Sequence, residues 1–236
     1  MKIAVLYSGG KDSNYAAYMS KINGDEISCL LTGLPDSEES FMFHFPNIGL
    51  TSLQSEAMNL PQLSFRTQGI PEEELNDLVN ALVKAKDLYD IEGIYTGGLS
   101  SNYQKKRFEG ICSDLNLECV NPLWGIDPKT YFNKILSLNF KVMVVGVAAE
   151  GLDENWLGKI FDYESIEELK MLSNQFKFDP LFEGGEGETL VIDSPLFIKK
   201  LEILDSSICR IGSYSYLKIT DAVLSDKHLI KSEVIS

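Results

Sequence analysis

The sequence predicts an α/β protein with a mostly parallel sheet, covered by helices on both faces, and a smaller C-terminal α+β section. The first observation is that short apolar runs alternate with segments of helical periodicity as far as Ala148. Such alternation is typical of parallel sheets, because each crossover helix returns the chain to the same end of the sheet. The second is that beyond Gly151 three strand-like stretches follow a single helix, with no helices between them. This change of rhythm predicts the C-terminal section, packed beside the ends of the parallel strands.

The individual elements follow from local patterns. The run Ile3–Tyr7 is apolar and precedes Ser-Gly-Gly, as in a strand buried on both faces that meets a loop. Apolar residues then recur at helical spacing as far as Ile22, and Asn23-Gly24 ends that helix. The further strands that we expect are Ile27–Leu31, Gln62–Arg66, Ile91–Thr96, Glu118–Val120, Lys141–Ala148, Glu188–Asp193, Leu201–Ile211 and Ser213–Ala222. The further helices are about Ser52–Asn59, Pro71–Tyr89, Ser101–Asn116, Pro128–Leu138 and Ser165–Ser173.

The composition argues against nucleic acid as the main substrate. The chain of 236 residues has 21 Lys and Arg against 35 Asp and Glu, a net charge of −14, which opposes sustained contact with a phosphate backbone. The first apolar run is too short for a signal peptide, and no segment reaches the roughly 18 uninterrupted apolar residues of a membrane span. The four cysteines form no CxxC pair, so we expect free thiols of a reducing compartment. We therefore expect a soluble, cytoplasmic protein.

A glycine-rich loop lies between the first strand and the first helix. In this position, glycine amides and a helix N-terminus form an anion site. We expect the whole loop to bind a nucleotide phosphate through bare backbone N–H groups, two hydroxyl donors and one positive charge, with these residues: Ser8, Gly9, Gly10, Lys11, Asp12 and Ser13. Asp12 is better explained as a Mg²⁺ ligand or a helix cap. The loop is not a Walker A motif, because Val5 stands where that motif begins with glycine.

A second glycine-rich stretch carries three carboxylates, those of Glu183, Glu186 and Glu188. The intervening glycines prevent a stable helix and predict a loop dense in negative charge. Near a nucleotide, such carboxylates hold Mg²⁺ or receive an ammonium ion and take a proton from it. Crowding of like charges raises the pKa of at least one carboxyl, as a general base requires. The plain alternative is a solvated acidic loop.

Other site candidates lie at strand ends and at the start of one helix. Gly97 and Gly98 follow a predicted strand, where ligands bind in open α/β sheets. Glu150 and Asp153 follow another strand and are weaker candidates. The helix that follows Gly98 begins with a basic cluster, in which Arg107 is best suited to bind phosphate or carboxylate, although an exposed helix face explains it equally well.

The chain resembles known families in several of these motifs. The Ser8–Ser13 loop matches the SGGxDS loop of the ATP-pyrophosphatase superfamily, and four longer stretches resemble the diphthine–ammonia ligase family. These stretches are 40–57, with His44 and Gln54-Ser55-Glu56-Ala57; 96–107, from Thr96-Gly97-Gly98 to Arg107; Asn121-Pro122-Leu123-Trp124; and 183–197, similar to the family's GEGGEYET segment. Two residues depart from the family pattern. Phe182 stands where the family usually has Gly, and Gly187 replaces an aromatic residue.

The resemblance implies a fold, a reaction and a set of site residues. It implies a parallel sheet of the HUP (adenine nucleotide alpha hydrolase) type, with an ATP-binding PP-loop domain over residues 1–125 and a C-terminal substrate-binding section over 126–236. ATP and Mg²⁺ are the expected cofactors, with Asp12 and Glu186 as metal ligands. The expected catalytic residues are Lys11, Asp12, Glu183, Glu186 and Glu188. Gly97 and Gly98 join the loop in nucleotide binding, and the expected substrate-binding residues are His44, Tyr103, Gln104, Arg107 and Thr189.

The implied reaction activates the carboxylate of diphthine, a modified histidine of elongation factor 2, as an acyl-adenylate, and then amidates it with ammonium. The partners are thus a protein and ammonium, with no membrane; the oligomeric state is not fixed by the sequence, and a homodimer stays open. The chain looks like the short form that is found in archaea. Two alternatives are a tRNA-modifying PP-loop enzyme and an ATP-binding regulatory module without chemistry. The net charge and the lack of paired cysteines argue against the first, and the intact loop motifs argue against the second.

Overall fold

The computed structural model describes residues 1–35, 47–67, 71–99 and 102–227, without the side chains of 71–73 and 102–104. Its α-helices are α1 Lys11–Ile22, α2 Thr51–Met58, α3 Pro71–Tyr89, α4 Asn102–Asp114, α5 Pro128–Ser137 and α6 Tyr163–Phe176. Its strands are β1 Lys2–Leu6, β2 Glu26–Pro35, β3 Gln62–Thr67, β4 Gly93–Tyr95, β5 Glu118–Val120, β6 Lys141–Val147, β7 Gly187–Asp193, β8 Lys199–Ile211 and β9 Tyr214–Asp226. Two short 3₁₀ helices, η1 Ile48–Leu50 and η2 Glu154–Trp156, complete the described elements.

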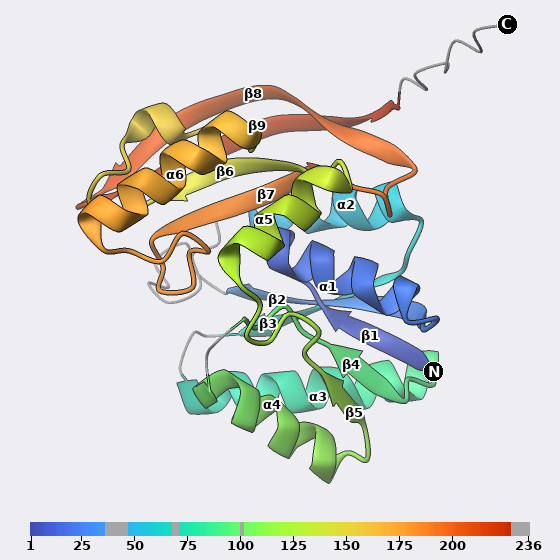
Figure 1. Ribbon diagram of the computed structural model, residues 1–236. Helices are drawn as coiled ribbons and strands as arrows, with labels where there is room; N and C mark the ends of the chain where they lie inside the picture. Colours follow the sequence, from blue (N-terminus) through green and yellow to red (C-terminus); the bar gives the residue numbers. More distant parts are fainter. Residues whose placement is uncertain (36–46, 68–70, 100–101, 228–236) are drawn as a thin grey trace, which may run out of the picture.

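The first sheet is parallel throughout the described strands, in the order β3-β2-β1-β4-β5. Figure 1 shows α1 and α2 on one face of this sheet and α3 and α4 on the other. The strands are apolar because both faces are covered: Ile3, Ala4 and Val5 of β1 are fully buried. The predicted α/β class and the parallel sheet are thereby confirmed. The connection from β1 to α1 places the glycine-rich loop at the carboxyl end of a central strand.

The second sheet contains β7-β6-β9-β8, and its pairs are antiparallel. The expectation that the strand Lys141–Ala148 belongs to the parallel sheet is wrong, because β6 pairs with β7 and β9 instead. A continuous apolar run indicates a strand covered on both faces but does not say in which sheet it lies. Here β6 is an inner strand of the second sheet, buried from Val142 to Val147. The expected smaller C-terminal α+β section is confirmed.

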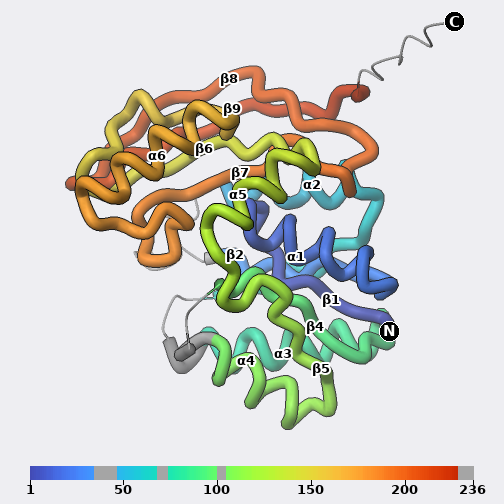
Figure 2. The backbone as a smooth tube through the Cα atoms, in the orientation of Figure 1, coloured from blue at the N-terminus to red at the C-terminus, as the bar shows by residue number. Residues whose placement is uncertain are grey.

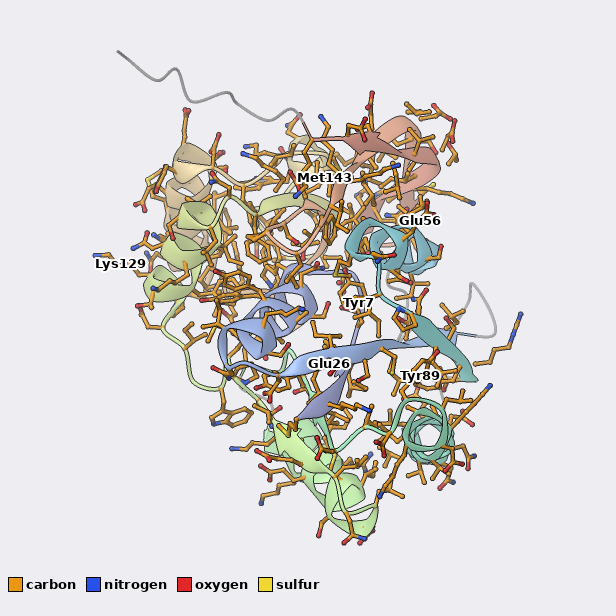
Figure 3. All side chains as sticks on the ribbon, turned by 90° about the vertical axis from the view of Figure 1, so that its right-hand side faces the viewer. Tyr7, Glu26, Glu56, Tyr89, Lys129 and Met143 are labelled. Atoms are coloured by element: carbon orange, nitrogen blue, oxygen red, sulfur yellow. The ribbon has the colours of Figure 1, made fainter. Side chains whose placement is uncertain are left out.

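The two sheets share one hydrophobic core. A single cluster of buried residues extends from Val5 and Tyr15 to Tyr131, Val144 and Leu169, and thus includes β1, α1, α5, β6 and α6. Figure 3 shows Tyr7, which follows β1, between the parallel sheet and the sheet that carries Met143. Because α1 and the loop before it lie at this junction, the second sheet can contribute side chains to the same site. No helix in the described part of the chain is both long and apolar enough to span a bilayer.

Candidate active site

The Ser8–Ser13 loop folds tightly between β1 and α1. The Ser13 hydroxyl accepts a hydrogen bond from the Ser8 backbone N–H (3.3 Å) and lies 3.2 Å from the Ser8 hydroxyl oxygen. Asn14 stabilises the loop, because its side-chain amide group donates hydrogen bonds to the carbonyls of Gly9 (3.1 Å) and Gly10 (3.0 Å). Gly10 is the N-cap of α1, and no side chain caps it. The carbonyls thus point into the protein, which leaves the amide side of the loop and the helix N-terminus suited to an anion.

Strand β7 of the second sheet is bonded directly to this loop. The Val191 N–H donates to the Gly9 carbonyl at 3.0 Å, and the Gln54 side-chain amide of α2 donates to that carbonyl (2.9 Å) and to the Val191 carbonyl (2.7 Å). Figure 2 shows the tube of β7 passing over α1. Gly9 has a φ of 83°, and a Cβ at this position would lie 2.5 Å from the Gln54 Oε1 atom. The loop conformation therefore requires glycine here.

Gly97 allows the end of β4 to approach the loop closely. A Cβ on Gly97 would lie 2.8 Å from the carbonyl carbon of Asp12 and from the backbone nitrogen of Ser13. Gly98 is less crowded, and its N–H lies 3.4 Å from the Thr96 hydroxyl, which itself bonds to the Asn121 side chain. Thus Gly97 is required for packing against the start of α1, whereas a Cβ on Gly98 would lie no closer than 3.7 Å to any neighbouring atom that limits it.

Lys11 points into the junction between the sheets. Its side chain is only 3% exposed, and its ammonium donates to the Asp12 carboxylate (2.8 Å) and to the Leu181 carbonyl (2.6 Å). The rings of Tyr131 and Phe182 lie with their centres 5.8 Å from this ammonium. An ammonium has three donors, and these two hydrogen bonds use two of them. The hydrogen bond from Lys11 to Leu181 therefore connects the phosphate loop to the segment that precedes the three glutamates.

Asp12 is held by a buried tyrosine. The Tyr131 hydroxyl of α5 donates to the Asp12 carboxylate at 2.6 Å. Burial raises the pKa of Tyr131 well above its ordinary value, and the charge of Asp12 raises it further. The phenol thus stays protonated and fixes Asp12, which is partly exposed. Tyr131 was not predicted as a site residue, because nothing in the pattern of α5 distinguishes it from a residue of the core. Gln54 was not predicted to have a role either, although it lies in one of the family stretches.

Glu188 is the carboxylate that lies against the loop. Burial raises its pKa to about 7, the charge of Asp12 raises it, and the charge of Lys11 lowers it. The next residue, Thr189, accepts a hydrogen bond from the Lys11 backbone N–H on its hydroxyl oxygen (3.2 Å). Strand β7 thereby places Glu188 near both charges of the loop, and its pKa suits a group that exchanges protons near neutral pH.

Glu186 organises its own loop. Its carboxylate accepts hydrogen bonds from the backbone N–H groups of Gly184 (2.7 Å) and Asp179 (3.3 Å). Its carbonyl accepts from Ala148 and Ala149, just beyond β6. Glu183 is partly buried, and its negative charge contributes to the raised pKa of Tyr131. The three glutamates therefore differ in environment, and Glu188 is the one whose pKa both Lys11 and Asp12 affect.

The remaining candidates lie on other elements or outside the described residues. His44 is outside the described residues, as are the side chains of Tyr103 and Gln104. Arg107 is partly exposed on α4. Glu150 is exposed, and Asp153 caps η2 by accepting a hydrogen bond from the Asn155 N–H at 3.0 Å.

Residues 1–119 match the model of the diphthamide synthase N-terminal domain, and residues 127–224 match that of the C-terminal domain. The chain belongs to the diphthamide synthase family. It is 33% identical to the human diphthine–ammonia ligase, over 96% of this chain and 94% of that protein. It is 31% identical to the diphthine–ammonia ligase of Schizosaccharomyces pombe, over 96% of this chain and 40% of the longer protein. The chain is thus a ligase of diphthamide synthesis.

Among solved structures, the chain is similar to a predicted subunit of tRNA methyltransferase from Methanocaldococcus jannaschii. The TM-score is 0.42 and the identity 16%, over 83% of this chain and 98% of that one. A likeness at this level supports no conclusion about function.

The structure explains the two departures from the family pattern together. Phe182 has a φ of 63°, in the left-handed region that favours glycine. A Cβ on Gly187 would lie 2.8 Å from the Phe182 ring. The ring of Phe182 therefore fills the space that a side chain at position 187 would need.

Proposed function

We propose that the protein adenylates the carboxylate of diphthine on elongation factor 2 with ATP and amidates it with ammonium, releasing AMP and pyrophosphate. The observation that supports this best is the contact between the two halves of the site. The phosphate loop of the first sheet is bonded to β7, and β7 presents Glu188 beside Lys11 and Asp12. This contact supports the assignment of a triphosphate site and a proton acceptor for the nucleophile to one junction.

In the first step, a carboxylate oxygen of the substrate attacks the α-phosphorus of ATP, and the bond to the bridging oxygen of pyrophosphate breaks. The Gly9 amide and the N-terminus of α1 are assigned to stabilise the negative charge that develops on the leaving group. The Lys11 N–H already donates to Thr189, and the Gly10 N–H lies 3.5 Å from the Ser8 hydroxyl. Lys11 adds a positive charge that is shielded from water by the rings of Tyr131 and Phe182.

In the second step, the nitrogen of ammonia attacks the acyl carbon, and AMP leaves with the electrons of the carbon–oxygen bond. Ammonium must lose a proton before its nitrogen has a lone pair. We assign this proton to Glu188, whose pKa of about 7 lets the carboxylate accept a proton at neutral pH. Glu186 is assigned a supporting role, because backbone N–H groups already occupy its carboxylate.

The residues present suit a Mg²⁺ ion that is bound mainly by the phosphate oxygens of the nucleotide. No group of three or more His, Cys, Asp or Glu side chains among the described residues is arranged to hold a metal ion. Mg²⁺ characteristically uses one or two carboxylates together with phosphate oxygens and water. Asp12, fixed by Tyr131 at the start of α1, is the carboxylate that would hold it. When bound, Mg²⁺ neutralises charge on the phosphate oxygens.

The experiment that tests the proposal combines enzyme, ATP, Mg²⁺, ammonium chloride and elongation factor 2 that carries diphthine. Amide formation should be matched by equal amounts of AMP and pyrophosphate. Replacement of both Lys11 and Asp12 by alanine should abolish product formation in a protein that remains folded by circular dichroism. Formation of ADP, or full activity of the folded double variant, would refute the proposal. Transfer of ATP-dependent modification to tRNA in place of the factor would favour the alternative enzyme class.

A further inference from the structure

Tyr214, at the start of β9, has a buried hydroxyl that makes no hydrogen bond to any described residue. Its ring stacks on that of Tyr216, with the centres 5.6 Å apart and the planes 17° from parallel. A buried hydroxyl without a partner is destabilising, and native proteins contain few of them.

The second sheet places this hydroxyl beside Glu188. Gly146 of β6 is paired with Glu188 of β7 on one side and with Tyr216 of β9 on the other. Directly opposed residues project to the same face, and so does Tyr214, two residues from Tyr216. A Cβ on Gly146 would lie 2.6 Å from the Tyr214 hydroxyl oxygen and 2.9 Å from the Glu188 Cβ. Because Gly146 has no side chain, the Tyr214 ring can lie across β6 with its hydroxyl on the side of Glu188.

The electrostatics agree with this geometry. Burial raises the pKa of Tyr214, and the negative charge of Glu188 raises it further. The two groups thus interact electrostatically, although no hydrogen bond joins them. A carboxylate and a phenol oxygen are both hydrogen-bond acceptors, and the faces of aromatic rings attract cations. This combination suits a small cation that donates hydrogen bonds in several directions.

We propose that Glu188 and Tyr214, brought together over Gly146, bind the ammonium ion that supplies nitrogen for the amidation. This inference rests on the proposed function and extends it to the site of the second substrate. One N–H of the ion donates to the carboxylate and another to the Tyr214 oxygen. Tyr214 orients the nitrogen while Glu188 takes one proton, and the nitrogen lone pair then forms the bond to the acyl carbon as AMP leaves with the electrons of the carbon–oxygen bond. The nitrogen releases its second proton to solvent, which leaves the neutral amide.

The test uses the full enzyme with diphthine-bearing elongation factor 2 and compares Tyr214→Phe with the wild type. The ring and its stacking remain, so only the hydroxyl is lost. The KM for ammonium should rise about tenfold, as expected when one hydrogen bond to a charged group is lost. The rate of ATP–pyrophosphate exchange, which reports adenylation alone, should stay within twofold. Potassium chloride keeps the ionic strength constant as the ammonium concentration varies.

Two further variants make the outcome specific. Tyr163→Phe, at an exposed position on α6, should leave the KM for ammonium unchanged. Gly146→Ala should raise that KM, because its Cβ would lie only 2.6 Å from the Tyr214 hydroxyl oxygen and would displace it. An unchanged ammonium KM in Tyr214→Phe would overturn the inference, as would a parallel loss of exchange and amidation. If the wild type itself showed no exchange, the proposed function would fail first, and the ammonium site would fail with it.

Discussion

At the residue scale, Phe182 and Gly187 behave as one unit. The Phe182 backbone is left-handed, its ring contacts the space over Gly187, and its face lies near the Lys11 ammonium. Neither residue can be understood from its own position alone. The sequence shows the two departures from the family pattern, but only the packing shows that the two residues share one space.

This coupling predicts a double-mutant cycle. Gly187→Tyr should lower the free energy of unfolding by about 1–3 kcal/mol, because the new ring and Phe182 compete for one space. Combination with Phe182→Gly should recover most of the loss, since the ring is removed and the left-handed backbone then carries glycine. Urea unfolding at pH 7.5 measures all four proteins. Additive effects of the two substitutions would show that the sites are independent.

Glu188 supports a second residue-scale prediction. Glu188→Gln keeps the size of the side chain but cannot accept the proton of ammonium. Amide formation should fall at least about 100-fold, the usual contribution of a general base, while ATP–pyrophosphate exchange continues. Glu150→Gln, at an exposed position, serves as the matched control. Equal losses in both half-reactions would assign Glu188 to adenylation instead.

At the scale of elements, β7 joins the two sheets into one site. It pairs with β6, its Val191 N–H bonds to the phosphate loop, and its first residues carry Glu188 and Thr189. Helix α6 supports this arrangement from the second sheet, since its buried residues Ile166 and Leu169 belong to the core that also contains Phe182. The stability of α6 therefore contributes to the position of the Lys11 contacts.

The Asp162 cap at the start of α6 predicts how the free energy of unfolding depends on pH. The Asp162 side chain accepts a hydrogen bond from the Ser165 N–H, and the Ser165 hydroxyl completes a capping box. Asp162→Ala should cost about 1 kcal/mol of unfolding free energy at pH 7. The bond to the backbone of Ser165 lowers the pKa of Asp162, so its contribution is present above the ordinary carboxyl pKa of 3.8 and disappears as the pH falls through the lowered value.

Thermal unfolding of the wild type and Asp162→Ala at several pH values between 7 and 3 measures this effect. The difference between the two proteins should be constant near neutrality and should shrink at the acid end. A difference that grows as the pH falls would contradict the assigned capping role.

At the scale of the whole molecule, local patterns predicted most elements and the parallel sheet, but not the pairing of β6 in the second sheet. The helix Pro71–Tyr89 and the strand Glu118–Val120 have the predicted bounds, because apolar periodicity and flanking residues determine them locally. The strand Lys141–Ala148 was placed in the wrong sheet, since strand pairing depends on contacts far apart in the sequence.

The same limit applies to the site. The loop motif and the glutamates were visible as short patterns in the sequence. The bonds of Lys11 to Leu181 and of Asp12 to Tyr131 span 170 and 119 residues, and the approach of Tyr214 to Glu188 depends on the pairing of β6 with β7 and β9. No local pattern contains such information, so these partners could be found only in the folded chain.

The central claim is that the two sheets together form a site for acyl transfer through an adenylate. Its most direct test labels the carboxylate oxygens of diphthine on elongation factor 2 with ¹⁸O and follows the label by mass spectrometry after a complete reaction with ATP, Mg²⁺ and ammonium. Attack of the carboxylate on the α-phosphorus predicts one ¹⁸O atom in the phosphate of each AMP released and none in pyrophosphate. Unlabelled AMP, or label in inorganic phosphate formed together with ADP, would contradict the account.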